Sequence, residues 1–172
     1  LVGDSPLICH KWSDKAKQMM LDKQMKKASK GKEAKDPEQD YQDSLYHLDD
    51  GGYGFPSVAF KSAAVGACRF AEMKMTEARG AFHVVGEMVT LEGEPRMRED
   101  MVRVGMGTAD IRYRGEFPEW SCTLTVVYNA NAISPAQIIN LFNVAGFGVG
   151  VGEWRPEKDG SYGRFHVALE GE

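Results

Sequence analysis

The clearest structural signal in the chain is the segment Ser134-Pro135-Ala136-Gln137-Ile138-Ile139-Asn140-Leu141-Phe142-Asn143-Val144-Ala145-Gly146. Its first four residues form a capping box, with proline at the first helical position, where the missing N–H costs nothing. Apolar side chains recur at helical spacing behind the cap, and Gly146 is the residue type that commonly ends a helix in a left-handed conformation. The segment therefore predicts a helix that begins at Ser134, ends at Gly146 and packs on a core.

Short strands are expected before and after this helix. β-branched residues favour strands, and every second side chain of a strand faces the same side of a sheet. In residues 110–114, for example, Ile111 and Tyr113 face one side and Arg112 and Arg114 the other. By these criteria, strands are predicted in residues 1–9, 82–88, 101–104, 111–113, 121–128, 147–154 and 163–169.

Two more helices are expected in the first half of the chain. Ser13 is a typical N-cap and Asp14 suits the first turn, so residues 13–29 are predicted to form a helix with methionines on one side and lysines on the other. The glycine-rich residues 49–56 lead into a mostly apolar helix at 57–71, which we expect to be buried on most of its faces.

The order of these elements indicates one α+β domain, residues 1–172, with helices on one face of an antiparallel sheet. An RRM-like or ferredoxin-like core is the simplest match. Residues at about 30–50 are polar and turn-rich and are expected to form a mobile insertion outside the core, and residues 92–107 a protruding hairpin or loop. The content of 42% hydrophobic and 27% charged residues is that of an ordinary globular protein.

Charge is distributed unevenly along the chain, although the formal net charge is only −4. Nine lysines and four acidic residues give residues 1–35 a net charge of +5, whereas residues 36–50 hold six acidic residues and no basic ones, a net charge of −6. All nine arginines lie from Arg69 onward, and arginine grips phosphate bidentately where lysine acts as a point charge. This distribution permits a local phosphate-binding groove, and it equally fits a solvated helix face with surface ion pairs.

Several classes of protein are disfavoured by the sequence. Cys9, Cys68 and Cys122 lie far apart and the four histidines lack metal-ligand spacing, so no disulfide framework, metal site or cofactor is predicted. The glycine-rich run 146–152 follows a helix instead of opening one, unlike a dinucleotide-binding loop. No apolar run reaches the roughly 20 residues of a membrane span and no secretory signal is evident, so we expect a cytoplasmic protein without a membrane partner.

The strongest candidate for a binding site is the glycine-rich loop near the C-terminus. Its glycines allow a ligand backbone to approach closely, its aromatic rings can stack on bases, and its cations can hold phosphates, which is the combination that single-strand binding requires. The alternative is a hairpin whose glycines only satisfy turn geometry. The aromatic and basic residues of the loop are Trp154, Arg155, Lys158, Tyr162, Arg164 and Phe165.

Three segments of the chain resemble the repeat-associated RRM-like proteins of CRISPR systems, the Cas5/Cas6/Cas7 superfamily. The first is residues 5–10, which resemble the end of the first strand in that group. The second is residues 55–63, which resemble the family pattern of a proline and small residues leading into a helix that carries lysine, a small residue and alanine. The third is the glycine-rich loop that ends at Gly163-Arg164-Phe165. Their order and placement are similar over most of the chain. Ser62 stands where glycine is typical, and Val65 where arginine is common. The chain is also similar to uncharacterised phage proteins encoded near recombination genes.

The resemblance implies an RRM-like core with Cas7-like insertions that binds single-stranded DNA or RNA along its backbone and assembles side by side with further copies. In this interpretation Lys61 and Arg69 line the groove, Arg112 and Arg114 project from a strand face, and the glycine-rich loop clamps the strand. The Lys-rich helix supplies a basic rim, and the acidic residues 36–50 contact a neighbouring subunit. The full set of expected nucleic-acid-binding residues is Lys11, Lys61, Arg69, Arg112, Arg114, Trp154, Arg155, Lys158, Tyr162 and Arg164.

Three functions are therefore open. The leading hypothesis is a non-enzymatic, homo-oligomeric single-strand-binding protein, such as a phage recombination or annealing factor. The second is a phage-encoded inhibitor or structural protein that docks on another protein through its charge blocks. The third is a Cas6-like RNA endonuclease with His10 as the general base, which the absence of a convincing acid/base pair disfavours.

Overall fold

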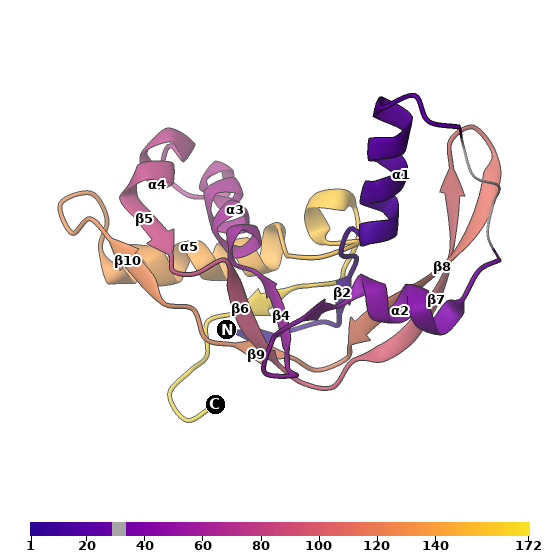
Figure 1. The fold of residues 1–172 in the computed structure, drawn as a ribbon. Helices are drawn as coiled ribbons and strands as arrows, with labels where there is room; N and C mark the ends of the chain where they lie inside the picture. Colours follow the sequence, from indigo (N-terminus) through magenta and orange to yellow (C-terminus); the bar gives the residue numbers. More distant parts are fainter. Residues whose placement is uncertain (29–33) are drawn as a thin grey trace.

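The computed structural model describes residues 1–28 and 34–172 and has an α+β architecture with antiparallel strands (Figure 1). The helical elements are α1 (Asp14–Gln24), α2 (Pro37–Ser44), α3 (Ser57–Ala67), η1 (Cys68–Phe70), α4 (Met75–Ala81), α5 (Pro135–Gly148) and η2 (Pro156–Lys158). The strands are β1 (Val2–Gly3), β2 (Leu7–Cys9), β3 (Tyr46–His47), β4 (Tyr53–Pro56), β5 (Phe82–Val84), β6 (Met88–Glu92), β7 (Arg96–Val104), β8 (Thr108–Phe117), β9 (Ser121–Cys122), β10 (Val126–Tyr128) and β11 (Phe165–His166).

In the described part of the chain the strands form three antiparallel sheets. The main sheet has the order β11-β1-β9-β6-β4-β3, so the two ends of the chain lie beside each other through the pair Val2 and His166. A second sheet, β2-β8-β7, carries the long hairpin β7–β8, and β5 pairs with β10 in the third. The prediction of the α+β class with antiparallel strands is confirmed.

Helices α3 and α5 pack against each other and cover the main sheet from one side. Phe60 of α3 is fully buried and makes edge-to-face contacts with Phe55 and Phe165, at ring-centroid distances of 5.9 and 6.0 Å. Trp120 packs on the rings of Phe60 and Phe165. Such pairs contribute about 0.5–1.5 kcal/mol each beyond the burial of their area. The expected apolar helix at 57–71 is thus confirmed as α3 with η1.

The capping box of α5 is confirmed, but its expected end is wrong. Ser134 Oγ accepts a hydrogen bond from Gln137 N, and Gln137 Oε1 accepts one from Ser134 N. Gly146 lies inside the helix, which continues to Gly148, and the left-handed residue is Gly150, with φ of +69°. Gly146 is required for a different reason: a Cβ there would overlap the carbonyl oxygen of Phe165.

The strand expected at 147–154 is also wrong. The alternation of valine and glycine arises because Val149 and Val151 point into the core, while Gly150 and Gly152 adopt positive φ angles of +69° and +78°. A strand cannot contain such angles, so the chain turns here. Residues 163–169 contain only the short β11, and residues 121–128 are divided between β9 and β10.

The expectation that residues at about 30–50 lie outside the core is wrong for the end of α2 and for β3, because Ser44 and Leu45 are buried and β3 belongs to the main sheet. Residues 29–33 lie outside the described part. Helix α2 lies along β8 (Figure 1), where Ser44 Oγ accepts a hydrogen bond from Gly115 N at 2.7 Å. Leu45 is 0% exposed because its side chain fills the space that Gly115 leaves beside it. The segment is polar in composition, yet its last turn is tied to the core.

The expected hairpin at 92–107 is confirmed and is longer than predicted, since β7 and β8 pair from Arg96–Glu116 to Val104–Thr108. Helix α1 begins as predicted, with Ser13 Oγ accepting from Ala16 N, but it ends at Gln24. Every residue of α1 is at least partly exposed, so its methionine side does not face the core. Helix α4 was not predicted from the sequence.

Candidate functional site

A cavity of about 400 Å³ lies between the end of β2, the first half of α3 and the glycine-rich loop. The three segments that carry the resemblance to CRISPR-associated proteins, far apart in sequence, all contribute to it. Pro56, Val58 and Ala59 form part of its apolar lining. Its polar and charged lining residues include His10, Ser62, Glu153, Arg155 and Glu157.

Backbone hydrogen bonds hold the glycine-rich loop against the first strands. Glu153 N donates to Ile8 O at 3.0 Å, and Gly163 N donates to Pro6 O at 2.8 Å. Gly152 and Gly163 have positive φ, and a Cβ on either would overlap a backbone carbonyl oxygen, of Ile8 and Val151 respectively. These two glycines therefore satisfy turn geometry and close packing of the loop itself.

Glu153 of the cavity lining pairs with one histidine and one arginine. Its Oε1 lies 3.3 Å from His10 Nδ1, and its Oε2 lies 3.5 Å from Arg114 Nη1. The hydrogen bond with His10 holds the pKa of Glu153 below its ordinary value, and the charges of Arg114 and Arg155 act in the same direction, against the effect of partial burial. Glu153 is therefore an ionised carboxylate at neutral pH.

Arg114 does not project from the sheet as expected, because its side chain is only 3% exposed. The guanidinium faces the ring of Trp154, with 5.6 Å between its central carbon and the ring centroid. Its Nε and Nη1 have no hydrogen-bond partner among the described residues, although Nη1 is within ion-pair distance of Glu153. Burial lowers the pKa of Arg114 from its ordinary value. Arg112, two residues earlier, is half-exposed and lies 4.0 Å from Asp110.

Trp154 and Tyr162 both contact Arg98 of the hairpin. The Arg98 guanidinium lies over the two rings, 5.3 Å from the centroid of Trp154 and 4.7 Å from that of Tyr162. The same side chain forms an ion pair with the buried Asp100 at 2.8 Å. The Arg98 guanidinium thus contacts both rings, and these contacts connect the hairpin to the loop.

Glu157 joins two of the predicted phosphate ligands. Arg155 Nε and Nη2 donate to Glu157 Oε2 at 3.2 and 3.1 Å, and Arg69 Nη2 lies 3.6 Å from Oε1 of the same carboxylate. Lys158 is exposed on η2, and Arg164 Nε donates to Ser161 O at 3.4 Å. Arg69 and Arg155 are therefore brought together by the Glu157 carboxylate.

The remaining two predicted residues lie away from the cavity lining. Lys61 is on α3 but points toward α4 and β5, where its Nζ donates to Arg79 O at 3.0 Å and lies 2.8 Å from His83 Nδ1. Lys11 follows β2, and its backbone N donates to Ser44 O. Of the ten predicted residues, only Arg155 lines the cavity, with Arg69 linked to it through Glu157.

Three groups of functional candidates were missed at the level of sequence. No role was assigned from the sequence to the carboxylates Glu153 and Glu157 of the glycine-rich loop, and Arg98 lies in the segment that was expected to protrude. Phe70 and Phe147, 58% and 75% exposed, lie at the ends of elements that the sequence assigned to the core or to a strand. Phe70 directly follows Arg69, and that aromatic–arginine pair was a signal that could have identified it.

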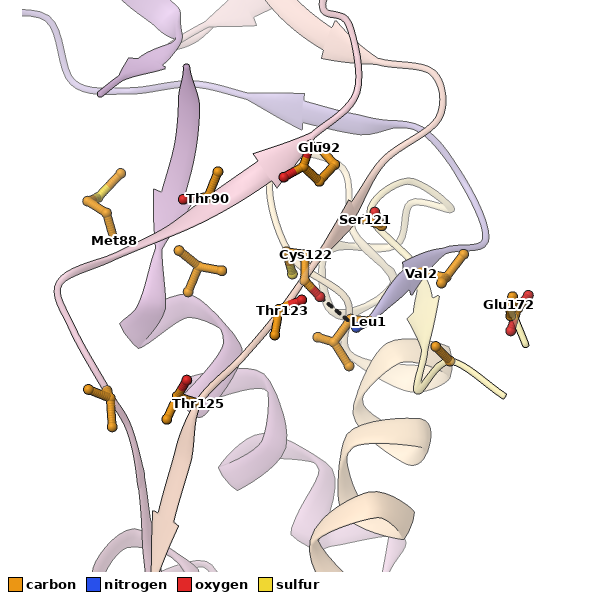
Figure 2. A pocket seen from close by; sticks show the side chains of 13 residues that line it. Leu1, Val2, Met88, Thr90, Glu92, Ser121, Cys122, Thr123, Thr125 and Glu172 are labelled. Atoms are coloured by element: carbon orange, nitrogen blue, oxygen red, sulfur yellow. Dashed lines mark hydrogen bonds between the residues drawn. The ribbon is translucent and has the colours of Figure 1, made fainter. Parts of the chain in front are cut away.

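A second cavity, of about 440 Å³, opens on the face of the main sheet away from α3 and α5 (Figure 2). It forms where β6 separates from residues 123–125, between Met88 and Thr90 on one side and Thr123 and Thr125 on the other. Leu1 N donates to Cys122 O at its edge. Its described lining contains Glu92 and Glu172 but neither lysine nor arginine, so this cavity is poorly suited to phosphate.

Within residues 1–28 and 34–172, no group of three or more histidine, cysteine or carboxylate side chains is arranged to hold a metal ion. In the same residues no helix is long and apolar enough to cross a bilayer. The chain matches no protein-family model, no curated protein and no solved structure.

Proposed function

We propose that this chain binds single-stranded nucleic acid beside the glycine-rich loop and that copies of it assemble side by side along the strand. The observation that carries the proposal is the convergence of β2, α3 and the loop on one cavity, with Arg69 and Arg155 at its side. Non-specific binding of a single strand uses a basic groove that follows the phosphate backbone and aromatic rings on which bases stack.

An RRM-like core is part of this proposal. The order β11-β1-β9-β6, with α3 between β1 and β6 in sequence and α5 between β9 and β11, supports it. The strands β4 and β3 extend this order at one edge. The pair Val2 and Ser121 is antiparallel, which distinguishes this sheet from a fold whose central strands run parallel.

Side-by-side assembly is supported by apolar surface on two projecting elements. Met19 of α1 and Met25, the residue that follows this helix, are exposed, as are Met101 and Met106 of the hairpin. Exposed apolar groups that cluster on projecting elements are typical of interaction surfaces. The basic helix α1 and the acidic helix α2 add opposite charges with which one copy can attract another.

The test is a fluorescence-anisotropy titration of the chain with a labelled DNA or RNA strand of about 30 nucleotides, at several salt concentrations. Binding should weaken steeply between about 50 and 200 mM salt, because phosphate contacts release counterions. Arg69→Gln combined with Arg155→Gln should reduce affinity and lower the salt slope by about 1–2. Lys74→Gln, which removes an exposed cation at the N-cap of α4, is the matched control. Light scattering with and without the strand tests assembly. No binding at low salt overturns the proposal.

One observation favours a second function, the Cas6-like RNA endonuclease. His10 lies in the cavity with its Nδ1 3.3 Å from the Glu153 carboxylate, which orients the imidazole as a general base requires. Cleavage of single-stranded RNA that is abolished by His10→Ala, with binding retained, would establish this activity. Binding without cleavage favours the non-enzymatic protein, and nuclease-resistant capture of a protein partner favours the docking alternative.

A further inference from the structure

We infer that Phe70 and Phe147 form the platform on which unpaired bases stack, where η1 meets the end of α5. This inference rests on the proposed function. It assigns base stacking to Phe70 and Phe147 in place of Trp154 and Tyr162, the aromatic residues expected from the sequence. Phe70 ends η1 and is 58% exposed, and Phe147 lies in the last turn of α5 and is 75% exposed. Neither ring is part of the core.

The two phenylalanines come from segments that are distant in sequence but adjacent in the fold. The ring of Phe70 lies over Gly148, since a Cβ on that glycine would be 3.2 Å from Phe70 Cε2. Gly148 is the residue next to Phe147, so Phe70 and Phe147 both lie where η1 meets the last turn of α5. A larger residue at 148 would push the Phe70 ring away from α5.

Charged side chains connect this platform to the cavity. The Arg69 guanidinium lies over the Phe70 ring, 4.8 Å from its centroid, and is 3.6 Å from Glu157. Glu157 in turn binds Arg155, and both Glu157 and Arg155 line the cavity. An aromatic face, two guanidiniums and the glycine-rich loop therefore follow one another along a continuous path.

This arrangement suits a nucleobase better than the rings of the loop do. Trp154 and Tyr162 are each covered on one side by Arg98, and Tyr162 Oη also lies 3.3 Å from Arg98 Nη1. Arg69 also lies over the Phe70 ring, but Phe70 and Phe147 are exposed residues, whereas Trp154 and Tyr162 are only partly exposed. Phosphates attached to a stacked base would meet Arg69 and Arg155. Every base has a π-face, so such a platform is tolerant of sequence.

The test compares Phe70→Ala, Phe147→Ala and the double variant with the unmodified chain, using a labelled single strand and an abasic strand of equal length. Each alanine should weaken binding to the base-containing strand by about 5- to 150-fold, the range measured for a base–aromatic stack. Phe70→Trp should retain binding. The salt slope should be unchanged, because the phosphate contacts remain, and binding to the abasic strand should be insensitive to both alanine substitutions.

Tyr128→Ala is the matched control, because Tyr128 is also an exposed aromatic residue. Tyr128 precedes the start of α5 and Phe147 lies in its last turn, so a helix about 20 Å long lies between them. Circular dichroism should show all variants folded, since both phenylalanines lie at the surface. If the unmodified chain binds and the double variant binds equally well, the platform is wrong and the proposed function stands. If the double variant loses self-association but keeps its affinity, the platform is also wrong. If the unmodified chain does not bind, the proposed function itself fails.

Discussion

Glu153 Oε1 lies 3.3 Å from His10 Nδ1 and thereby joins the end of the first strands to the glycine-rich loop. The other oxygen of this carboxylate faces the buried Arg114, so one side chain connects the cavity, the loop and the hairpin. Together with the backbone hydrogen bonds from Glu153 N to Ile8 O and from Gly163 N to Pro6 O, this contact ties the loop to the first strands.

Glu153→Gln should destabilise the chain by about 2 kcal/mol, because it leaves the buried Arg114 charge without its ionic partner. The cost is below that of a fully buried pair, since Glu153 is half-exposed. Because the pKa of Glu153 is lowered in the folded chain, its contribution is present above the carboxyl pKa of the unfolded chain and is lost as pH falls through the folded pKa. Urea unfolding at neutral and acidic pH should show the difference from the unmodified chain shrinking in acid.

Glu157→Gln provides a comparison at the same loop with the opposite expected effect on binding. Removal of this carboxylate frees Arg69 and Arg155 from their shared partner, so affinity for a single strand should rise severalfold. Stability should change by at most about 1 kcal/mol, because partly exposed ion pairs contribute little. Anisotropy titration measures the affinity; a decrease would mean that Glu157 itself positions the two arginines for binding.

Gly146→Ala should destabilise the chain by about 1–3 kcal/mol, the usual cost of overpacking. The new Cβ would overlap the carbonyl oxygen of Phe165 and separate α5 from β11. The matched control is Gly80→Ala in α4, where nothing lies within 4 Å of an added Cβ. That control should be neutral or stabilising by up to about 1 kcal/mol. Thermal melts that order the two variants the other way would contradict the packing described for α5.

His166 should titrate above the ordinary range for histidine. Its Nε2 is hydrogen-bonded to Glu172 and its Nδ1 to Asp4, and these contacts raise the pKa of the imidazole. Glu172→Gln and Asp4→Asn should each lower the pKa, which an NMR titration of the ring proton measures. The stabilisation is complete below the pKa of an unfolded histidine and fades as pH rises through the folded pKa. An unchanged midpoint in both variants would refute these contacts in solution.

Local signals were sufficient for the elements whose start depends on nearby residues. The caps at Ser13 and Ser134 hydrogen-bond within their own first turns, so the starts of α1 and α5 could be predicted from the sequence. The antiparallel α+β class and the hairpin after residue 92 followed from the alternation and order of short segments.

The candidate site was predictable only in part. The importance of the glycine-rich loop and of Arg155 was evident from composition, because glycine, arginine and aromatic residues are concentrated there. The burial of Arg114 and the contact of Trp154 with Arg98 depend on the hairpin folding back on the loop. Nothing near these residues in sequence indicates that contact.

Residues 134–137 alone specified where a helix begins, because a capping box is a contact between side chain and backbone three positions apart. Where that helix ends was decided by tertiary structure: Gly146 is a packing residue against Phe165, and the left-handed turn falls at Gly150. In the same way, composition alone indicated that residues 36–50 are acidic and polar. Tertiary contacts tie the segment to the core, through the packing of Leu45 on Gly115, the hydrogen bond from Gly115 N to Ser44 Oγ and the pairing of β3 with β4. Short-range contacts are encoded by spacing along the chain, whereas the space available to a side chain is set by residues that folding brings beside it.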